Sequence, residues 1–175
     1  ALLQFWHYLT GLVQGDLGTS LKSGQPVLSE ILLRLPATLE ISIAAVLVAI
    51  LVGTPIGVLS ATRPNSFFDH LVRVVSLTGV SMPAFLLALI LQLVFATWLG
   101  WLPVSGRMSS YLFVDHVTGF ALIDAWLSDE TGAVKSAILH MILPVTVLAA
   151  FLAATLGRFV RASMLETLGE DYVRT

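Results

Sequence analysis

The sequence predicts an all-α membrane protein, built as a polytopic helical bundle. Of its 175 residues, 57% are hydrophobic and only 11% are charged, against about 25% in a typical soluble domain. Three long runs of the chain contain no Asp, Glu, Lys or Arg. These runs are continuous rather than alternating, which favours helices over the strands of a membrane barrel. A soluble enzyme and a disordered protein are therefore both disfavoured.

The charge-free runs cover residues 41–62, 74–106 and 136–157, with 22, 33 and 22 residues. A helix needs about 20 mostly apolar residues to cross a bilayer, so each run fits one crossing. We predict spans at 37–61, 74–102 and 137–157. Pro36 suits the first turn of the first span, and the second span has a small, semi-polar entry. One internal proline is expected to kink each span: Pro55, Pro83 and Pro144.

Lys and Arg predict the orientation of these spans. Segments 61–73 and 158–175 hold five basic residues in 31, whereas 1–35 and 101–136 hold four in 71. The denser side is expected to be cytoplasmic. Residues 1–35 then form a periplasmic segment whose aromatic side chains, at helical spacing, predict an interfacial helix. Residues 103–136 form a periplasmic loop, and 158–175 extend the third span into the cytoplasm.

Small and polar residues within the spans are the candidate functional positions. Gly53 and Gly57 make a small-xxx-small pattern that predicts close helix packing. Gln92 either lines a path or makes a helix–helix hydrogen bond, and the second interpretation is favoured. The residues assigned to a translocation path are Ser81, Met82, Pro83 and Gln92.

Several kinds of chemistry are disfavoured by what the sequence lacks. The chain has no Cys, which excludes a thiolate metal site, and its four His lack ligand spacing, so no metal site and no cofactor are predicted. A net charge of −2 gives no sign of nucleic-acid binding. Lys22 and Lys135 are the only lysines, and neither follows a glycine as in a phosphate-binding loop. Any ATP-driven function would need a separate ATPase subunit.

Several motifs, taken in order, make the chain resemble a known family. They are GDLGTS at 15–20, RLPATLE at 34–40, GTPIG at 53–57, SMPAF at 81–85, WLPVSG at 101–106, HMILP at 140–144 and the segment 158–175, which ends in DYVRT. With these motifs the chain resembles the permease subunit of bacterial ABC importers of the dipeptide, oligopeptide, glutathione and nickel group. The resemblance covers nearly the whole chain except the loop 107–135.

This resemblance implies a type I ABC importer permease fold with six spans in the cytoplasmic (inner) membrane, of which this chain would supply the second to fourth. It implies alternating-access import of peptides or a related small solute, such as nickel or glutathione. The implied partners are cytoplasmic ABC ATPase subunits, a second permease subunit and an extracytoplasmic solute-binding protein. The residues matching the leading edge of the ATPase-coupling loop are Glu170, Asp171, Tyr172, Val173, Arg174 and Thr175.

Three alternatives compete with this interpretation. A secondary transporter or channel subunit usually carries ionisable groups at span centres, and the three predicted centres carry none. An intramembrane protease would need Ser81 as nucleophile and His140 as base, but Met82 and Pro83 follow the serine where a glycine is usual. The third is a non-functional fragment of a permease. The chain has no initiator Met, signal peptide or terminal helix cap, so we expect a fragment.

Overall fold

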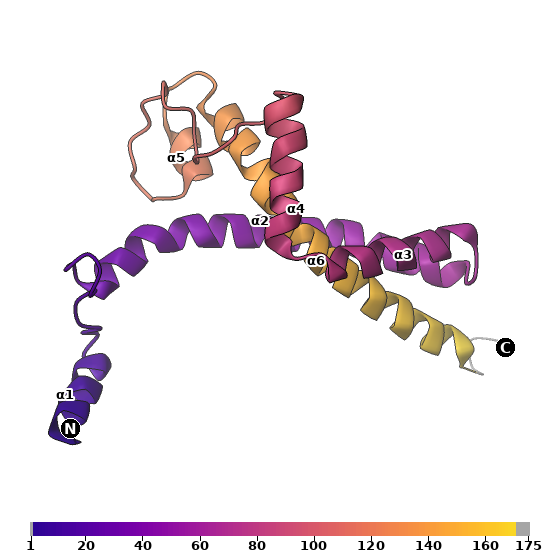
Figure 1. The fold of residues 1–175 in the computed structure, drawn as a ribbon, viewed down its shortest axis with the longest axis horizontal. Coiled ribbons are helices and arrows are strands. Elements are labelled where there is room, and N and C mark those ends of the chain that lie inside the picture. Colours follow the sequence, from indigo (N-terminus) through magenta and orange to yellow (C-terminus); the bar gives the residue numbers. More distant parts are fainter. Residues whose placement is uncertain (1, 171–175) are drawn as a thin grey trace.

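A computed structural model describes residues 2–170, apart from the side chains of 2–4, 7 and 80, and shows helices joined by loops (Figure 1). The described part of the chain has no β-strand, only one isolated bridge between Thr19 and Pro26. The predicted all-α class is therefore confirmed. The elements are α1 (Leu2–Val13), α2 (Val27–Thr62), α3 (Phe67–Ser81), α4 (Ala84–Leu91), the π-helix η1 (Gln92–Trp98), α5 (Ala121–Leu127) and α6 (Ala133–Gly169).

The two longest helices, α2 and α6, cross near the middle of the molecule and form its main packing contact (Figure 1). Small side chains line the crossing, because they allow the two backbones to approach closely. Ala45 of α2 is buried there against Val145 and Ala149 of α6, and Ala49, one turn further along α2, is buried as well. Within the described residues, α2 and α6 are the two single helices long and apolar enough to cross a membrane.

The first long helix starts earlier than the sequence predicts. We expected the span to open at Pro36, but α2 already begins at Val27 and continues through Pro36 and Pro55. An ion pair from Arg34 to Glu30, at 2.9 Å and four residues apart, supports these early turns. Proline removes one backbone hydrogen bond, and here the helical residues on both sides of Pro36 continue the helix in spite of that loss.

The second predicted span, 74–102, is not one helix. The chain breaks at Met82 and Pro83, and the helices on either side are inclined by 103° to each other. Met82 has an extended backbone, as expected for a residue that precedes proline. In Figure 1, α3 lies beside the C-terminal part of α2 while α4 and η1 turn away from it. A third crossing results only if this bent pair counts as one span.

The predicted loop 103–136 folds into a small outer lobe that contains α5 (Figure 1). Ala125 of α5 is buried against Ala133 and Ala137 at the start of α6. Helix α6 then runs without interruption to Gly169, so the third predicted span and most of the segment 158–175 belong to a single helix.

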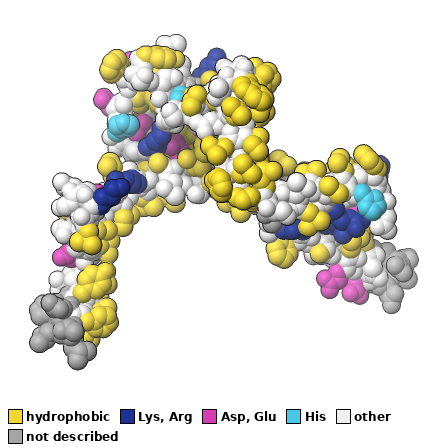
Figure 2. Space-filling model, in the orientation of Figure 1, with side chains coloured by type: hydrophobic (Ala, Val, Ile, Leu, Met, Phe, Trp, Pro, Cys, Tyr) yellow, Lys and Arg dark blue, Asp and Glu magenta, His cyan; other side chains and the backbone are white. Residues whose placement is uncertain are grey.

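The surface separates apolar from charged regions. Figure 2 shows hydrophobic side chains over α4 and η1, whereas charged side chains gather over the outer lobe and near α3. Phe85, Leu89 and Trp98 are among the exposed apolar residues of the α4–η1 face. Helix α1 extends away from the bundle and exposes Phe5 and Trp6 (Figure 1). Exposed apolar surface of this extent is what a lipid-facing protein presents.

Candidate functional site

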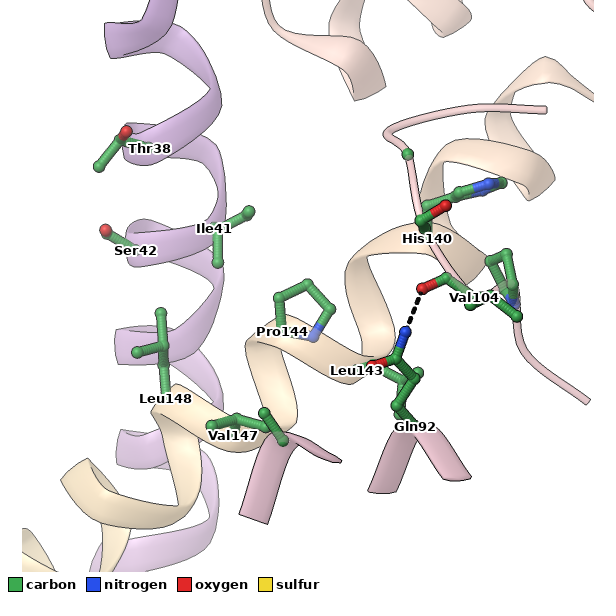
Figure 3. A pocket seen from close by; sticks show the side chains of 14 residues that line it. Thr38, Ile41, Ser42, Gln92, Val104, His140, Leu143, Pro144, Val147 and Leu148 are labelled. Atoms are coloured by element: carbon green, nitrogen blue, oxygen red, sulfur yellow. Dashed lines mark hydrogen bonds between the residues drawn. The ribbon is translucent and has the colours of Figure 1, made fainter. Parts of the chain in front are cut away.

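A cleft of about 560 Å³ lies between α2, α4–η1, the loop 103–106 and α6 (Figure 3). None of the residues that line it is Asp, Glu, Lys or Arg. Its apolar walls include Ile41 of α2 and Val147 of α6. Hydrogen-bonding side chains are contributed by Thr38, Ser42, Gln92, Ser105 and His140. The cleft therefore offers uncharged donors and acceptors on an apolar background, as small-molecule sites do.

Gln92 closes one edge of the cleft. Its Nε2 donates a hydrogen bond of 2.8 Å to the Val104 carbonyl, drawn as the dashed line in Figure 3. The favoured interpretation, in which Gln92 makes a helix–helix hydrogen bond, is therefore wrong, because the acceptor lies in the loop after η1. Gln92 begins a π-helix, a rare geometry that is frequent at functional sites. Trp101 also holds this loop. Its backbone N–H donates a hydrogen bond to the Phe95 carbonyl, and the centroids of the Trp101 and Phe95 rings are 6.0 Å apart.

His140 lies at the same end of the cleft, on α6. Its Nδ1 lies 2.7 Å from the Ser136 carbonyl, which can only accept, so Nδ1 donates and Nε2 is left for another partner. Ser81 instead donates from its Oγ to Leu77 O of its own helix, at 2.8 Å. Ser81 and His140 each bond to their own helix, and this arrangement does not support the nucleophile–base pair that an intramembrane protease needs.

A second polar cluster, absent from the sequence-based candidates, lies where α2, α3 and α6 meet. Asp69 is completely buried and receives hydrogen bonds from Ser60 Oγ and from the Asn65 N–H. Arg161 of α6 donates to it from Nε at 2.7 Å and from Nη2 at 2.9 Å. Arg73 of α3 donates to the same carboxylate. This carboxylate therefore joins three helices and is satisfied on both oxygens.

The sequence did carry a signal for this cluster. Ser66 is the N-cap of α3, and its Oγ accepts a hydrogen bond from the Asp69 N–H. Ser followed by an acidic residue three positions later is a helix-start signature. That pattern predicts where α3 begins, but the partnership with Arg161, 92 positions later, depends on how the helices pack.

A third cluster attaches the outer lobe to α2. Glu40 accepts hydrogen bonds from the N–H groups of Ala121 and Leu122, the first residues of α5, and pairs with Arg107 at 3.0 Å. Arg107 also donates to the Gly119 carbonyl at 2.8 Å. Gly119 has φ +81°, and a Cβ there would lie 3.1 Å from the Pro36 ring. Residues Pro36 and Glu40 of the motif at 34–40 thus contact the lobe and attach it to α2.

Asp124 organises the interior of the lobe. It is buried and accepts hydrogen bonds from the N–H and Oγ1 of Thr118 and from the Gly119 N–H. Burial by itself raises the pKa of Asp124, but these hydrogen bonds outweigh burial and hold the pKa below its ordinary value.

Comparisons with known proteins decide the family. Residues 53–175 match the model of the binding-protein-dependent transport system inner membrane component. The chain belongs to this family. The resemblance stated from the motifs and the inner-membrane localisation are thereby confirmed.

The similarity to named relatives extends over nearly all of this chain. The chain is 48% identical over 172 residues to the di/tripeptide transport system permease protein DppB of Pseudomonas aeruginosa, covering 98% of this chain and 51% of the relative. It is 45% identical over 174 residues to the probable D,D-dipeptide transport system permease protein DdpB of Escherichia coli K12, covering 99% and 51%. It is 41% identical to the putrescine export system permease protein SapB of Escherichia coli K12, covering 97% and 53%. The chain therefore spans about half the length of these relatives.

Within this inner membrane component, the two glycines of the small-xxx-small pattern lie on α2 and face α6. A Cβ at Gly53 would lie 2.8 Å from Ala153 O, and a Cβ at Gly57 would lie 2.7 Å from Gly157 O. Both distances are shorter than real Cβ contacts, so only glycine fits without displacing a backbone.

The residues assigned to the translocation path separate into two groups. Gln92 lines the cleft, whereas Ser81, Met82 and Pro83 lie at the break between α3 and α4 and do not line it. The sequence placed all four in one span, and the 103° bend moves three of them away from the fourth.

The residues assigned to ATPase coupling follow the end of α6. Glu170 is extended, and its N–H donates to Thr167 O at 3.3 Å. The other five, Asp171, Tyr172, Val173, Arg174 and Thr175, lie outside the described residues. Their role stays a prediction.

Proposed function

We propose that this chain is part of the membrane-spanning subunit of an ATP-driven importer for peptides or a related small solute. The observation that carries the proposal is the uncharged cleft between the two long apolar helices. Peptide groups are neutral and need both donors and acceptors, which the side chains of Ser42, Gln92 and His140 supply. The peptide-transport names of two relatives support the same class of cargo.

We propose alternating access as the mechanism. Pro144 and Val147 form part of the cleft wall, and the same helix continues to Gly169, just before the proposed coupling residues. A helix transmits displacement along its axis, at about 1.5 Å per residue, because its backbone hydrogen bonds resist stretching. Motion imposed beyond Gly169 would therefore reach the cleft wall through one continuous element.

The partners follow from what the permease requires. ATP hydrolysis would be supplied by cytoplasmic ABC ATPase subunits, because the sequence contains no phosphate-binding loop. A second permease subunit would complete the path, and an extracytoplasmic solute-binding protein would deliver cargo. A secondary transporter is the less favoured alternative, because ion coupling usually relies on ionisable groups in the path, and the cleft lining holds His140 but no Asp, Glu, Lys or Arg.

The test is uptake of a radiolabelled dipeptide by cells that express the full-length permease with its partners. Ser42→Trp places a bulky side chain in the cleft, and Leu51→Trp adds the same side chain at an exposed position of the same helix. We expect the first variant to lose uptake and the second to retain it, with equal amounts in the membrane. Uptake that survives Ser42→Trp, or deletion of the whole gene, would contradict the proposal.

A further inference from the structure

The cluster around Asp69 continues the packing seam between α2 and α6. Gly57 lies against Gly157 and Val160, so the two backbones approach closely there. About one helical turn further along each helix, Ser60 and Arg161 meet at the Asp69 carboxylate. The seam of small residues therefore ends in an ionic junction that also includes the start of α3.

This junction is built to define one arrangement of the helices. Both Arg161 donors reach the carboxylate, Nε to one oxygen and Nη2 to the other, which fixes orientation as well as distance. The Asp69 side chain is wholly buried and the Arg161 side chain is 22% exposed. A buried ion pair adds little net stability compared with apolar packing, and its best-attested role is to specify register. The register of α6 against α3 also bears on the segment that follows α3.

The segment that follows α3 forms part of the cleft wall. Helix α3 ends at the Met82–Pro83 break, and α4 and η1 then supply Ala88 and Gln92 to the wall of the cleft. The other wall belongs to α6, which carries Arg161 on its distant half. Both walls of the cleft are thus connected through helices that are joined at Asp69.

We propose that the Asp69–Arg161 junction is a positioning contact that makes α3 move together with the cytoplasmic half of α6. Displacement of the end of α6 is passed through Arg161 to α3, and from there across the break to α4 and η1. This inference rests on the proposed function, because it assigns the junction to the coupling of ATP hydrolysis to opening of the cleft.

A distance measurement tests the junction without altering it. These 175 residues contain no Cys, so in a full-length permease with any other cysteines replaced, spin labels attach at His70→Cys of α3 and Glu166→Cys of α6, both exposed positions. We would measure the distance between the two labels by pulsed electron–electron double resonance, in the assembled full-length importer in lipid, with and without ATP. We expect one narrow distribution that is the same in both states. A distribution that broadens or shifts with ATP would overturn the proposal.

A variant pair tests its consequence. Arg161→Gln removes the junction, and Arg158→Gln removes an exposed arginine three residues earlier on the same helix. In proteoliposomes we expect Arg161→Gln to lower the solute imported per ATP hydrolysed by about tenfold, within the usual range for coupling between sites. Arg158→Gln should leave this ratio unchanged. A purely structural role would lower the amount of assembled complex and leave the ratio intact, which would overturn the proposal.

The two experiments separate this inference from the proposed function. If the unmodified importer fails to take up peptide, the proposed function is wrong, while the His70–Glu166 distances still show whether α3 and α6 form one body. If the Arg161→Gln permease does not assemble, the distances between labels at positions 70 and 166, measured with Asp69 and Arg161 intact, decide whether α3 and α6 move together. If uptake is normal and the distances change with ATP, the proposed function stands and only the proposal that α3 and α6 move together is wrong.

Discussion

Glu40, in the N-terminal half of α2, is paired with Arg107, 67 positions later in the outer lobe, at 3.0 Å. The Glu40 side chain is only 8% exposed, and its two oxygens also accept the first two N–H groups of α5. A side chain of a predicted membrane helix therefore caps a short helix of the outer lobe. The attachment of the lobe to the bundle depends on this carboxylate.

Replacing Glu40 should loosen the lobe. Glu40→Leu leaves the Ala121 and Leu122 N–H groups without acceptors, and hydrogen bonds to charged groups contribute about 1.5–3 kcal/mol each. We expect amide hydrogen exchange in 119–127 to accelerate by at least about tenfold, since 1.4 kcal/mol corresponds to a factor of ten. Glu130→Leu, an exposed position of the same lobe, is the control. Equal protection in the two variants would show that Glu40 does not hold α5.

The close packing of Gly53 and Gly57 against α6 predicts that a larger side chain at either position is destabilising. Gly53→Ala places a methyl group 2.8 Å from the Ala153 carbonyl, so α2 and α6 must separate. We expect a loss of about 1–3 kcal/mol in the free energy of unfolding in detergent, the usual cost of overpacking. Gly79→Ala in α3 meets nothing within 4 Å and should stabilise the protein slightly, because alanine favours helices. The prediction fails if the two substitutions have the same effect.

The stability of the lobe should depend on pH through Asp124. Hydrogen bonds hold the pKa of Asp124 below its ordinary value in the folded state. A lowered pKa means that the carboxylate stabilises the lobe at pH values above its unfolded pKa of about 3.9, and that this contribution is lost as pH falls through the lower folded value. We expect exchange in 118–127, corrected for its intrinsic pH dependence, to rise below about pH 4.

The control for this effect is Asp124→Asn. The amide cannot ionise and accepts hydrogen bonds with one oxygen only. We expect faster exchange at neutral pH and a flatter profile on acidification. An unchanged acid profile in this variant would assign the pH dependence to other groups.

Gln92 should influence transport more than folding. Gln92→Met keeps the length of the side chain and removes the donor to Val104 O, a net loss of about 1 kcal/mol for one hydrogen bond. The loop 103–106 would then be free to move at the edge of the cleft. We expect peptide uptake at low concentration to fall about fivefold, which corresponds to that energy. Leu93→Met, at the neighbouring exposed position, should have no effect.

Much of the helical architecture follows from composition and periodicity. The first and third charge-free runs locate the long helices α2 and α6, because the absence of charge over about 20 residues is a strong local signal. The Gly53 and Gly57 pair is also visible in the sequence, because the spacing of four places both on one face of a helix. Where a helix starts is harder to predict, as α2 shows. The signal at Pro36 is local, whereas the helix is continued by the residues on both sides of it.

The sequence by itself determined that this chain is helical, apolar and related to transport permeases, because those properties lie in residue types and short motifs. Only the tertiary structure decided that Gln92 binds Val104, that Glu40 caps α5 and that Asp69 binds Arg161. Each of these contacts joins residues 12 to 92 positions apart. These partners are chosen by how distant helices pack. The proline at 83 indicates a bend in the sequence, but the spacing of neighbouring residues gives neither its angle of 103° nor the residues that meet because of it.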